Sequence, residues 1–170
     1  MSFNSNNFYK FKNENIDYGG YTILRNKKIC LAMDTGSSPD FKHSRDYQSG
    51  ALSFEIISNG KKLITNCGYY EGKNNKLTQL SKSTATHSTL IIDDNSSCKF
   101  TKKKDKLILK TGLKITQKNS VFEKNYWKIS AAHDGYLKKF KSIHERNIEF
   151  FPEQMKFVGN DRIIRKKNKL

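Results

Sequence analysis

Five polar side chains that can bind a metal, transfer a proton or contact an anion fall near the expected ends of neighbouring strands. His43, Arg45 and Asp46 lie in one loop, Asn66 ends an apolar run, and His87 precedes another. Neutral imidazole and carboxylate are normal zinc ligands. The spacing contains no compact ligand motif, however. The spacing alone favours structural roles for these residues, in which Asp46 caps a turn and His87 forms a hydrogen bond to the backbone.

The elements that must position these side chains follow from a period of two in the sequence. Residues 51–58 alternate between apolar and other side chains, and the dipeptide Asn59-Gly60 follows. This dipeptide is typical of a two-residue type I′ hairpin, so 61–66 should pair back onto 51–58. A third strand is expected at 88–92, just after His87.

The remainder of the chain also predicts strands. Short β-branched and aromatic runs separated by turn residues occur at 21–24, 29–33, 107–110, 113–116, 126–132, 148–151, 155–158 and 162–165. Sustained helical spacing is absent. This pattern predicts an all-β chain folded as an antiparallel β-sandwich. The long irregular stretches at 35–48 and 68–86 are expected to be functional or mobile loops.

Length and composition predict one folded domain without a membrane span. A chain of 170 residues with 12% aromatic residues can form a hydrophobic core. No apolar run approaches the 18 residues or so that a spanning helix needs. The first 15 residues lack the apolar centre of a secretion signal. The three cysteines are too widely spaced for a zinc motif and are expected to be buried, small hydrophobic residues.

The formal net charge of +16 raises the question of a polyanionic partner. Nucleic-acid sites favour Arg for bidentate contacts, but only five of the 32 basic residues are Arg. The aromatic residues mostly alternate into apolar faces, which counts against a nucleic-acid-binding barrel. A polyanionic sugar would suit the charge, and so would solvated lysines with no partner.

Several short motifs resemble the C-terminal β-domain of the heparinase II/III family of polysaccharide lyases. The sharpest are His87-Ser88-Thr89-Leu90 and His133-Asp134-Gly135-Tyr136, with Asn66-Cys67-Gly68 resembling an Asp-x-Gly strand end. The resemblance covers about residues 17–165. It implies a supersandwich-like β-sandwich that is incomplete here. Residues 1–16 would be a linker from a missing N-terminal helical domain, and 166–170 a basic tail.

The resemblance also implies roles for individual residues. Family members that hold a metal use an Asp and two His, and the matching positions here are Asp46, Asn66 and His87. Asn brings no charge, so we expect a degenerate site and no cofactor, with zinc confined to intact family members. His43 would be a supporting catalytic residue.

Three further residues, Arg45, His144 and Arg146, would bind substrate. An arginine fork suits a carboxylate or sulfate. His144 and Arg146 alternate on one expected strand face, whereas His133 is expected in a turn.

The implied function is β-elimination in an anionic polysaccharide such as a glycosaminoglycan or alginate. The partners would be that polysaccharide and a helical toroid domain, in cis or in trans, which carries the family's catalytic Tyr. The isolated chain should then be inactive, and its parent protein should reside in the periplasm or cell envelope. The alternative is a non-catalytic basic β-sandwich that binds acidic glycans or a partner chain.

Overall fold

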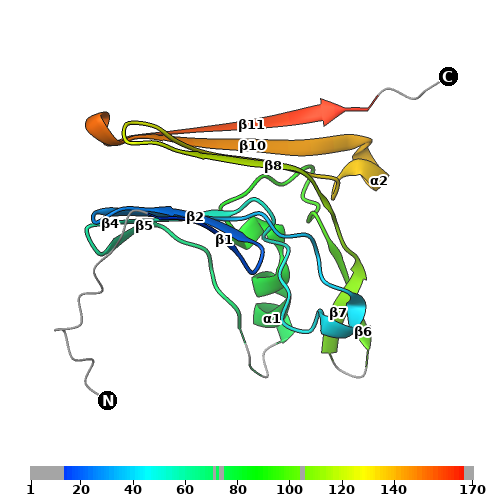
Figure 1. Ribbon diagram of the computed structural model, residues 1–170. Coiled ribbons are helices and arrows are strands. Elements are labelled where there is room, and N and C mark those ends of the chain that lie inside the picture. The colour runs from blue at the N-terminus through cyan, green and yellow to red at the C-terminus, as the bar shows by residue number, and fades with distance from the viewer. Residues whose placement is uncertain (1–13, 71, 73–74, 104–105, 167–170) are drawn as a thin grey trace, which may run out of the picture.

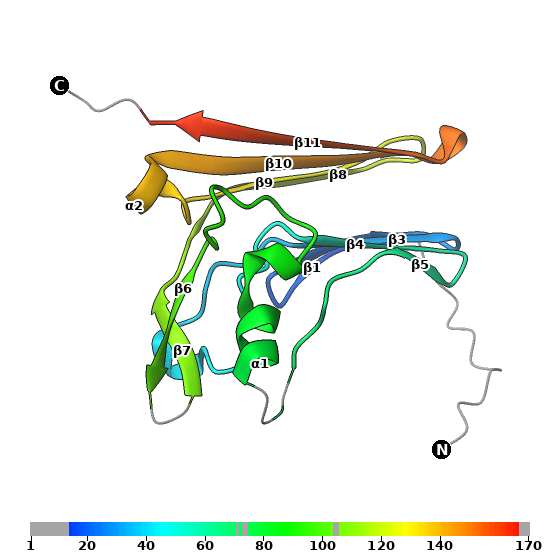
Figure 2. The same cartoon turned by 180° about the vertical axis from the view of Figure 1, so that it is seen from behind.

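The protein folds into two stacked antiparallel sheets with a smaller arm on one side (Figures 1 and 2). The computed structural model describes residues 14–70, 72, 75–103 and 106–166. A five-stranded sheet has the order β1-β2-β3-β4-β5, and a four-stranded sheet has the order β11-β10-β9-β8. The hairpin β6–β7 and helix α1 lie on the side of the five-stranded sheet that faces away from the four-stranded sheet.

The five-stranded sheet is formed by β1 (Glu14–Tyr18), β2 (Tyr21–Arg25), β3 (Ile29–Asp34), β4 (Phe54–Ser58) and β5 (Lys61–Ile64). The four-stranded sheet is formed by β8 (Ile115–Phe122), β9 (Trp127–His133), β10 (Ser142–Phe151) and β11 (Lys156–Arg165). The arm contains α1 (Asn75–Lys82), β6 (Lys99–Lys103) and β7 (Lys106–Thr111). Short α2 (Leu137–Phe140) and the 3₁₀ turns η1 (Phe41–His43), η2 (Thr84–Thr86) and η3 (Pro152–Gln154) complete the chain.

The core fills the space between the two large sheets. Alternate residues of β3 and β10 are buried, as a strand with one face inward requires. Leu31 and Met33 of β3 are fully buried in the same cluster as Trp127 and Phe150. The rings of Trp127 and Phe150 meet edge to face at 5.0 Å between centroids. The predicted all-β sandwich is confirmed.

The turn at Asn59-Gly60 is confirmed as well. Both residues have positive φ, 48° and 77°, as a type I′ turn requires. The strand before the turn is shorter than predicted, because Leu52 takes a φ of 60° and its amide donates to the Asp34 carbonyl at 2.8 Å. This left-handed residue breaks the extended run, so β4 begins only at Phe54.

Two predictions were wrong, one for the second long loop and one for the segment that follows it. Residues 75–82 form a helix that the sequence did not predict. Its leucines Leu77 and Leu80 remain 43% and 52% exposed, so the helix does not bury an apolar face. A helix held by polar contacts shows no apolar stripe. The strand expected at 88–92 does not form either; only an isolated bridge joins Ile92 to Asn95.

Two other segments also differ from the prediction. The turn expected at 159–161 is absent, and β11 runs unbroken along the whole of β10. Of the three free cysteines, Cys98 is buried as expected, Cys30 is intermediate and Cys67 is exposed.

Much of the two terminal segments lies outside the described residues. Residues 1–13 of the expected linker are not described, whereas 14–16 lie in β1. Of the expected basic tail only Lys166 is described. None of the described helices is long and apolar enough to cross a membrane.

The core predicts a clear contrast between two phenylalanines. Replacing fully buried Phe150 with Ala should lower the free energy of unfolding by about 3–5 kcal/mol, because it removes apolar burial and leaves a cavity. Phe41 is 54% exposed, so Phe41→Ala should change stability by less than about 1 kcal/mol. Urea unfolding followed by Trp127 fluorescence measures both. Equal losses would contradict this assignment of the core.

Candidate functional site

The three residues that the family resemblance assigned to a metal line one cavity. It has a volume of about 760 Å³ and lies at the ends of β2, β3 and β5, where Asp46, Asn66 and His87 contribute to its wall. Asp46 comes from the loop before β4, Asn66 from the end of β5, and His87 from the segment after η2. The sequence therefore correctly predicted that these three residues come together.

Asn66 makes hydrogen bonds through both its side chain and its backbone amide. Its Oδ1 accepts from the Ser88 amide at 2.7 Å, and its Nδ2 donates to Ser53 Oγ at 3.4 Å. Its own amide donates to Glu55 Oε1 at 3.0 Å. The side chain thus joins the end of β5 to the 88–92 segment, and its oxygen is already used as an acceptor.

His87 presents one unused ring nitrogen. Its Nδ1 lies 2.8 Å from the Ser83 carbonyl, which can only accept, so Nδ1 carries the proton. The lone pair is then on Nε2, which is buried and has no hydrogen-bond partner among the described residues. Gly50 makes room for the ring, since a Cβ there would meet His87 Cδ2 at 3.0 Å. Burial lowers the pKa of His87, which favours the neutral ring.

These residues do not form a complete zinc ligand set. His87 Nε2 is suited to a metal, but the Asn66 oxygen is uncharged and engaged, and the Asp46 carboxylate is exposed beside Arg45 at 3.6 Å. Within the described part of the chain, no three His, Cys, Asp or Glu side chains are grouped to hold a metal ion. Whether the chain carries zinc stays a prediction.

The cavity contains acidic and phenolic groups that the sequence reasoning missed. Asp34, Glu55 and Tyr21 also line it, whereas no Lys or Arg is among the described lining residues. Burial raises the pKa of Asp34 to about 6, although the Gly36 amide opposes this by donating to its Oδ1 at 3.0 Å. Burial also raises the pKa of Tyr21, and the charges of Asp34 and Glu55 raise it further. The available signal was the position of Asp34 at a strand end, two residues before a glycine.

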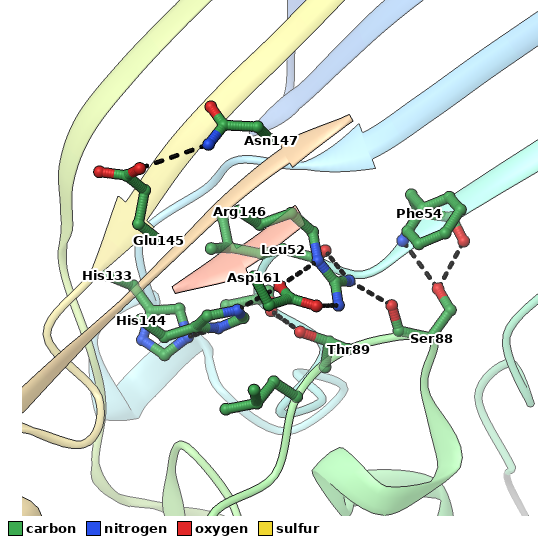
Figure 3. A network of polar contacts seen from close by, with 12 residues as sticks. Leu52, Phe54, Ser88, Thr89, His133, His144, Glu145, Arg146, Asn147 and Asp161 are labelled. Atoms are coloured by element: carbon green, nitrogen blue, oxygen red, sulfur yellow. Dashed lines mark hydrogen bonds and ion pairs between the residues drawn. The ribbon is translucent and has the colours of Figure 1, made fainter. Parts of the chain in front are cut away.

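A buried polar network fixes one wall of the cavity (Figure 3). Arg146 projects from β10 and its Nη1 donates to the carbonyls of Leu52, at 2.8 Å, and Ser88. Its Nε and Nη2 donate to the two carboxylate oxygens of Asp161 on β11, each at 2.7 Å. One guanidinium therefore ties the four-stranded sheet to the turn before β4 and to the segment that contacts Asn66.

Two histidines extend this network, and their proton positions follow from it. The Gly135 amide donates to His133 Nδ1 at 3.0 Å, so the proton of a neutral His133 is on Nε2. That nitrogen lies 3.2 Å from His144 Nδ1, and His144 Nε2 lies 2.7 Å from Asp161 Oδ1. The hydrogen bonds run in one direction, from Gly135 through both rings to Asp161.

The network shifts two pKa values. Burial, together with the nearby His144 and Arg146, lowers the pKa of His133 to about 3. Burial disfavours the Asp161 carboxylate, but hydrogen bonds from His144 and Arg146 outweigh this and hold its pKa below the usual range. His133 thus lies buried in β9, not in the expected turn, at 1% exposure.

The other predicted site residues occupy different settings. His43 is exposed on η1 and does not line the cavity, and Arg45 lines a second, neighbouring cavity. His144 and Arg146 share one strand face, as expected, but that face is interior and the two side chains are 0% and 6% exposed. The substrate and catalytic roles of all four stay predictions.

The fold and the cavity define a β-sandwich domain with a polar cleft at its strand ends. The sequence matches the family described as heparinase II/III-like, C-terminal, over residues 12–169, and the chain belongs to this family. No curated protein sequence gives a significant match.

Solved structures share the fold at low sequence identity. Heparan sulfate lyase HepC from Pedobacter heparinus has a TM-score of 0.63 at 20% identity and covers 87% of this chain. A structure described as heparinase III has a TM-score of 0.61 at 22% identity with the same coverage. The chain spans only 21% and 22% of the lengths of those two proteins.

The buried arginine gives a sharp stability prediction. Arg146→Met should lower the free energy of unfolding by about 3–5 kcal/mol, because it leaves two carbonyls without this donor and Asp161, among the described residues, with only the hydrogen bond from His144. Arg162 pairs with Glu145 at 2.8 Å but is 60% exposed, so Arg162→Met should cost less than about 1 kcal/mol. Chemical denaturation at neutral pH measures both variants. A loss for Arg146→Met no larger than the control would refute the anchoring role.

Stability should also depend on pH through His133. The unfolded chain binds a proton near the ordinary histidine pKa of about 6.5, whereas folded His133 does so only near 3. Its contribution is therefore present above pH 6.5 and is lost as the pH falls toward 3. His133→Gln should reduce the slope of the unfolding free energy against pH between pH 6.5 and 4. The reduction should correspond to at most one fewer proton taken up on unfolding. An unchanged slope would mean that His133 titrates normally.

Proposed function

We propose that this chain is the β-domain of a polysaccharide lyase that cleaves uronate-containing polysaccharides by β-elimination. The observation that carries the proposal is the family match over residues 12–169, together with a cavity where Asp46, Asn66 and His87 meet. The heparan sulfate lyase that shares the fold acts on an anionic polysaccharide, as its description says. An anionic glycan is the substrate class we infer for this chain.

Elimination next to a uronate needs three functions from the protein. Polar groups must stabilise the enolate-like charge, a base must remove the proton at the adjacent carbon, and an acid must protonate the leaving oxygen. Within this chain we assign the supporting acid or base role to His43, whose exposed ring is accessible to a substrate. Arg45 keeps the substrate-binding role inferred from the resemblance because it is exposed, whereas the buried His144 and Arg146 would act on substrate binding only by holding the cavity wall.

The remaining functions would come from a helical domain, supplied in cis or in trans. The described residues contain only α1, of eight residues, and α2, of four, whereas 87% of this chain covers only 21% of the heparan sulfate lyase, which is therefore about four times as long. We infer that the chain alone is inactive. An enzyme for such substrates would work in the periplasm or cell envelope, where it meets polysaccharide.

Complementation tests the proposal. The chain would be incubated with heparan sulfate, heparin, hyaluronan or alginate, with and without a helical domain encoded beside it. Ultraviolet absorbance of the unsaturated uronate product should rise only when both parts are present. A rise with the chain alone would overturn its inactivity, and no rise with any substrate would overturn the lyase assignment.

The role of His43 has its own test in the complemented enzyme. A positioned acid or base contributes about 10²–10⁴-fold in rate, so His43→Ala should lower kcat by about 10²-fold or more. The neighbouring exposed Lys42 provides the control, and Lys42→Ala should stay within about twofold. Equal activity of the two variants would remove His43 from the chemistry.

The second candidate is a non-catalytic basic β-sandwich that binds acidic glycans or a partner chain. The net charge of +16 favours it, because a strongly basic surface attracts polyanions whatever its catalytic content. Retention of the chain on heparin with no product in the complementation assay is the outcome that selects this candidate.

A further inference from the structure

A second cavity lies in the arm, beside helix α1 and the β6–β7 hairpin. Both elements lie below the five-stranded sheet in Figure 2. Its volume is about 230 Å³. Four cationic side chains line it, together with two tyrosines and several neutral residues: Arg45, Lys82, Lys102, Lys106, Tyr69, Tyr70, Gly72, Thr78, Gln79 and Leu107. Among the described lining residues there is no Asp or Glu.

Lys82 is the central group of this cavity. It ends α1 and is 3% exposed, although lysine is seldom buried without an anionic partner. Its Nζ donates to the carbonyls of Arg45 at 2.6 Å and Tyr47 at 2.8 Å. An ammonium group has three donors, so one remains for a ligand.

The surroundings of Lys82 are aromatic and carry no compensating charge nearby. Its Nζ lies 5.0 Å from the ring centroid of Phe100 and 5.9 Å from that of Tyr69. No ion pair within 4 Å joins it to a carboxylate in the described part of the chain. Burial lowers the pKa of Lys82, and only the more distant Asp46 opposes this. An anion placed here would offset the cost of burying the ammonium.

The two cavities have opposite charge and adjoining walls. Among the described lining residues, the first cavity has Asp34, Asp46 and Glu55 but no Lys or Arg, whereas the second has four cationic residues but no Asp or Glu. Arg45 of the second cavity pairs with Asp46 of the first at 3.6 Å. Residues 46–48 and Gly68 line the first, while their direct neighbours Arg45 and Tyr69 line the second. A chain-like ligand that leaves the first cavity along either segment therefore reaches the second.

We propose that this second cavity is a subsite that binds an anionic sugar residue, through its sulfate or carboxylate, next to the acidic cavity. The inference rests on the proposed polysaccharide substrate and deepens it. Lys82 supplies the buried cation, and Lys102 and Lys106 supply exposed cations at the rim. Tyr69, which is 42% exposed, offers a ring face to the sugar.

Paired lysine variants test the subsite in the full chain. The double variant Lys102→Gln/Lys106→Gln removes two exposed rim charges without touching the core. Lys61 and Lys62 on β5 are also exposed and line neither cavity, so Lys61→Gln/Lys62→Gln is the matched control. The probe is a heparin hexasaccharide, with uncharged maltohexaose as a comparison, and calorimetry measures both at low and physiological salt.

The rim variant should weaken hexasaccharide binding about fivefold to tenfold, and the control by less than about twofold, since only the rim pair lies close to the bound anion. Maltohexaose should not bind. Tyr69→Ala should weaken binding, whereas Tyr18→Ala, at an 81% exposed ring, should not. Equal losses in both lysine pairs would overturn the subsite in favour of diffuse attraction by the net charge.

Lys82→Met completes the test, with circular dichroism as the check on folding. A folded Lys82→Met chain should lose hexasaccharide binding at least tenfold, and retained binding would overturn the role of Lys82. Poly-glutamate is the competing probe. If it displaced the hexasaccharide and its binding were weakened equally by Lys102→Gln/Lys106→Gln, the ligand would be an acidic peptide and not an anionic sugar.

The outcome also separates this inference from the lyase assignment. Product formation in the complementation assay with equal losses in both lysine pairs refutes only the subsite. Rim-specific binding with no product refutes only the lyase, and the cavity then serves the glycan-binding candidate.

Discussion

The guanidinium of Arg146 holds together the parts of the molecule that form its main cavity. It reaches from the four-stranded sheet to the Leu52 carbonyl in the turn before β4 and to the Ser88 carbonyl beyond η2. Ser88 in turn donates its amide to Asn66 at the end of β5. The relative positions of three segments that are distant in sequence thus depend on one side chain, and the cavity wall follows from them.

Such an anchor is costly because it buries a charge, and the surrounding network offsets that cost. Asp161 accepts two hydrogen bonds from Arg146 and one from His144, so the charge is paired and its donors are used. His133 stays neutral because burial, and the nearby Arg146 cation, lower its pKa to about 3. A buried ionic network of this kind adds little net stability but specifies one arrangement of the segments that it joins.

Charge is divided between the two cavities rather than spread evenly over the molecule. The larger cavity gathers carboxylates, a phenol and the unused nitrogen of His87, while the smaller one gathers cations around Lys82. A net charge of +16 would attract any polyanion from a distance. The proposed subsite depends on this local contrast, since an anionic group is favoured beside Lys82.

The sequence by itself determined whatever depends on neighbouring residues. The period of two in residues 51–58 predicted the apolar face of β4, and Asn59-Gly60 predicted the turn, because its two left-handed positions suit these residue types. The sequence also predicted that Asp46, Asn66 and His87 lie near one another, although only Asn66 follows a strand, whereas Asp46 lies in the loop before β4 and His87 follows η2. The family motifs gave the class of domain.

Tertiary structure alone decided the features that depend on distant partners. Helix α1 is held by polar contacts, such as the Gln48 side chain donating to the Ser81 carbonyl at 2.7 Å, so no apolar stripe marks it. Leu52 adopts its left-handed conformation in a turn where its amide donates to the Asp34 carbonyl. At the start of the segment 88–92, the backbone amide and carbonyl of Ser88 bond to the side chains of Asn66 and Arg146 instead of to a neighbouring strand. Lys82 and Arg146 look like ordinary solvated cations in sequence. Their burial follows from carbonyl groups that lie dozens of residues away, and local patterns carry no information about these.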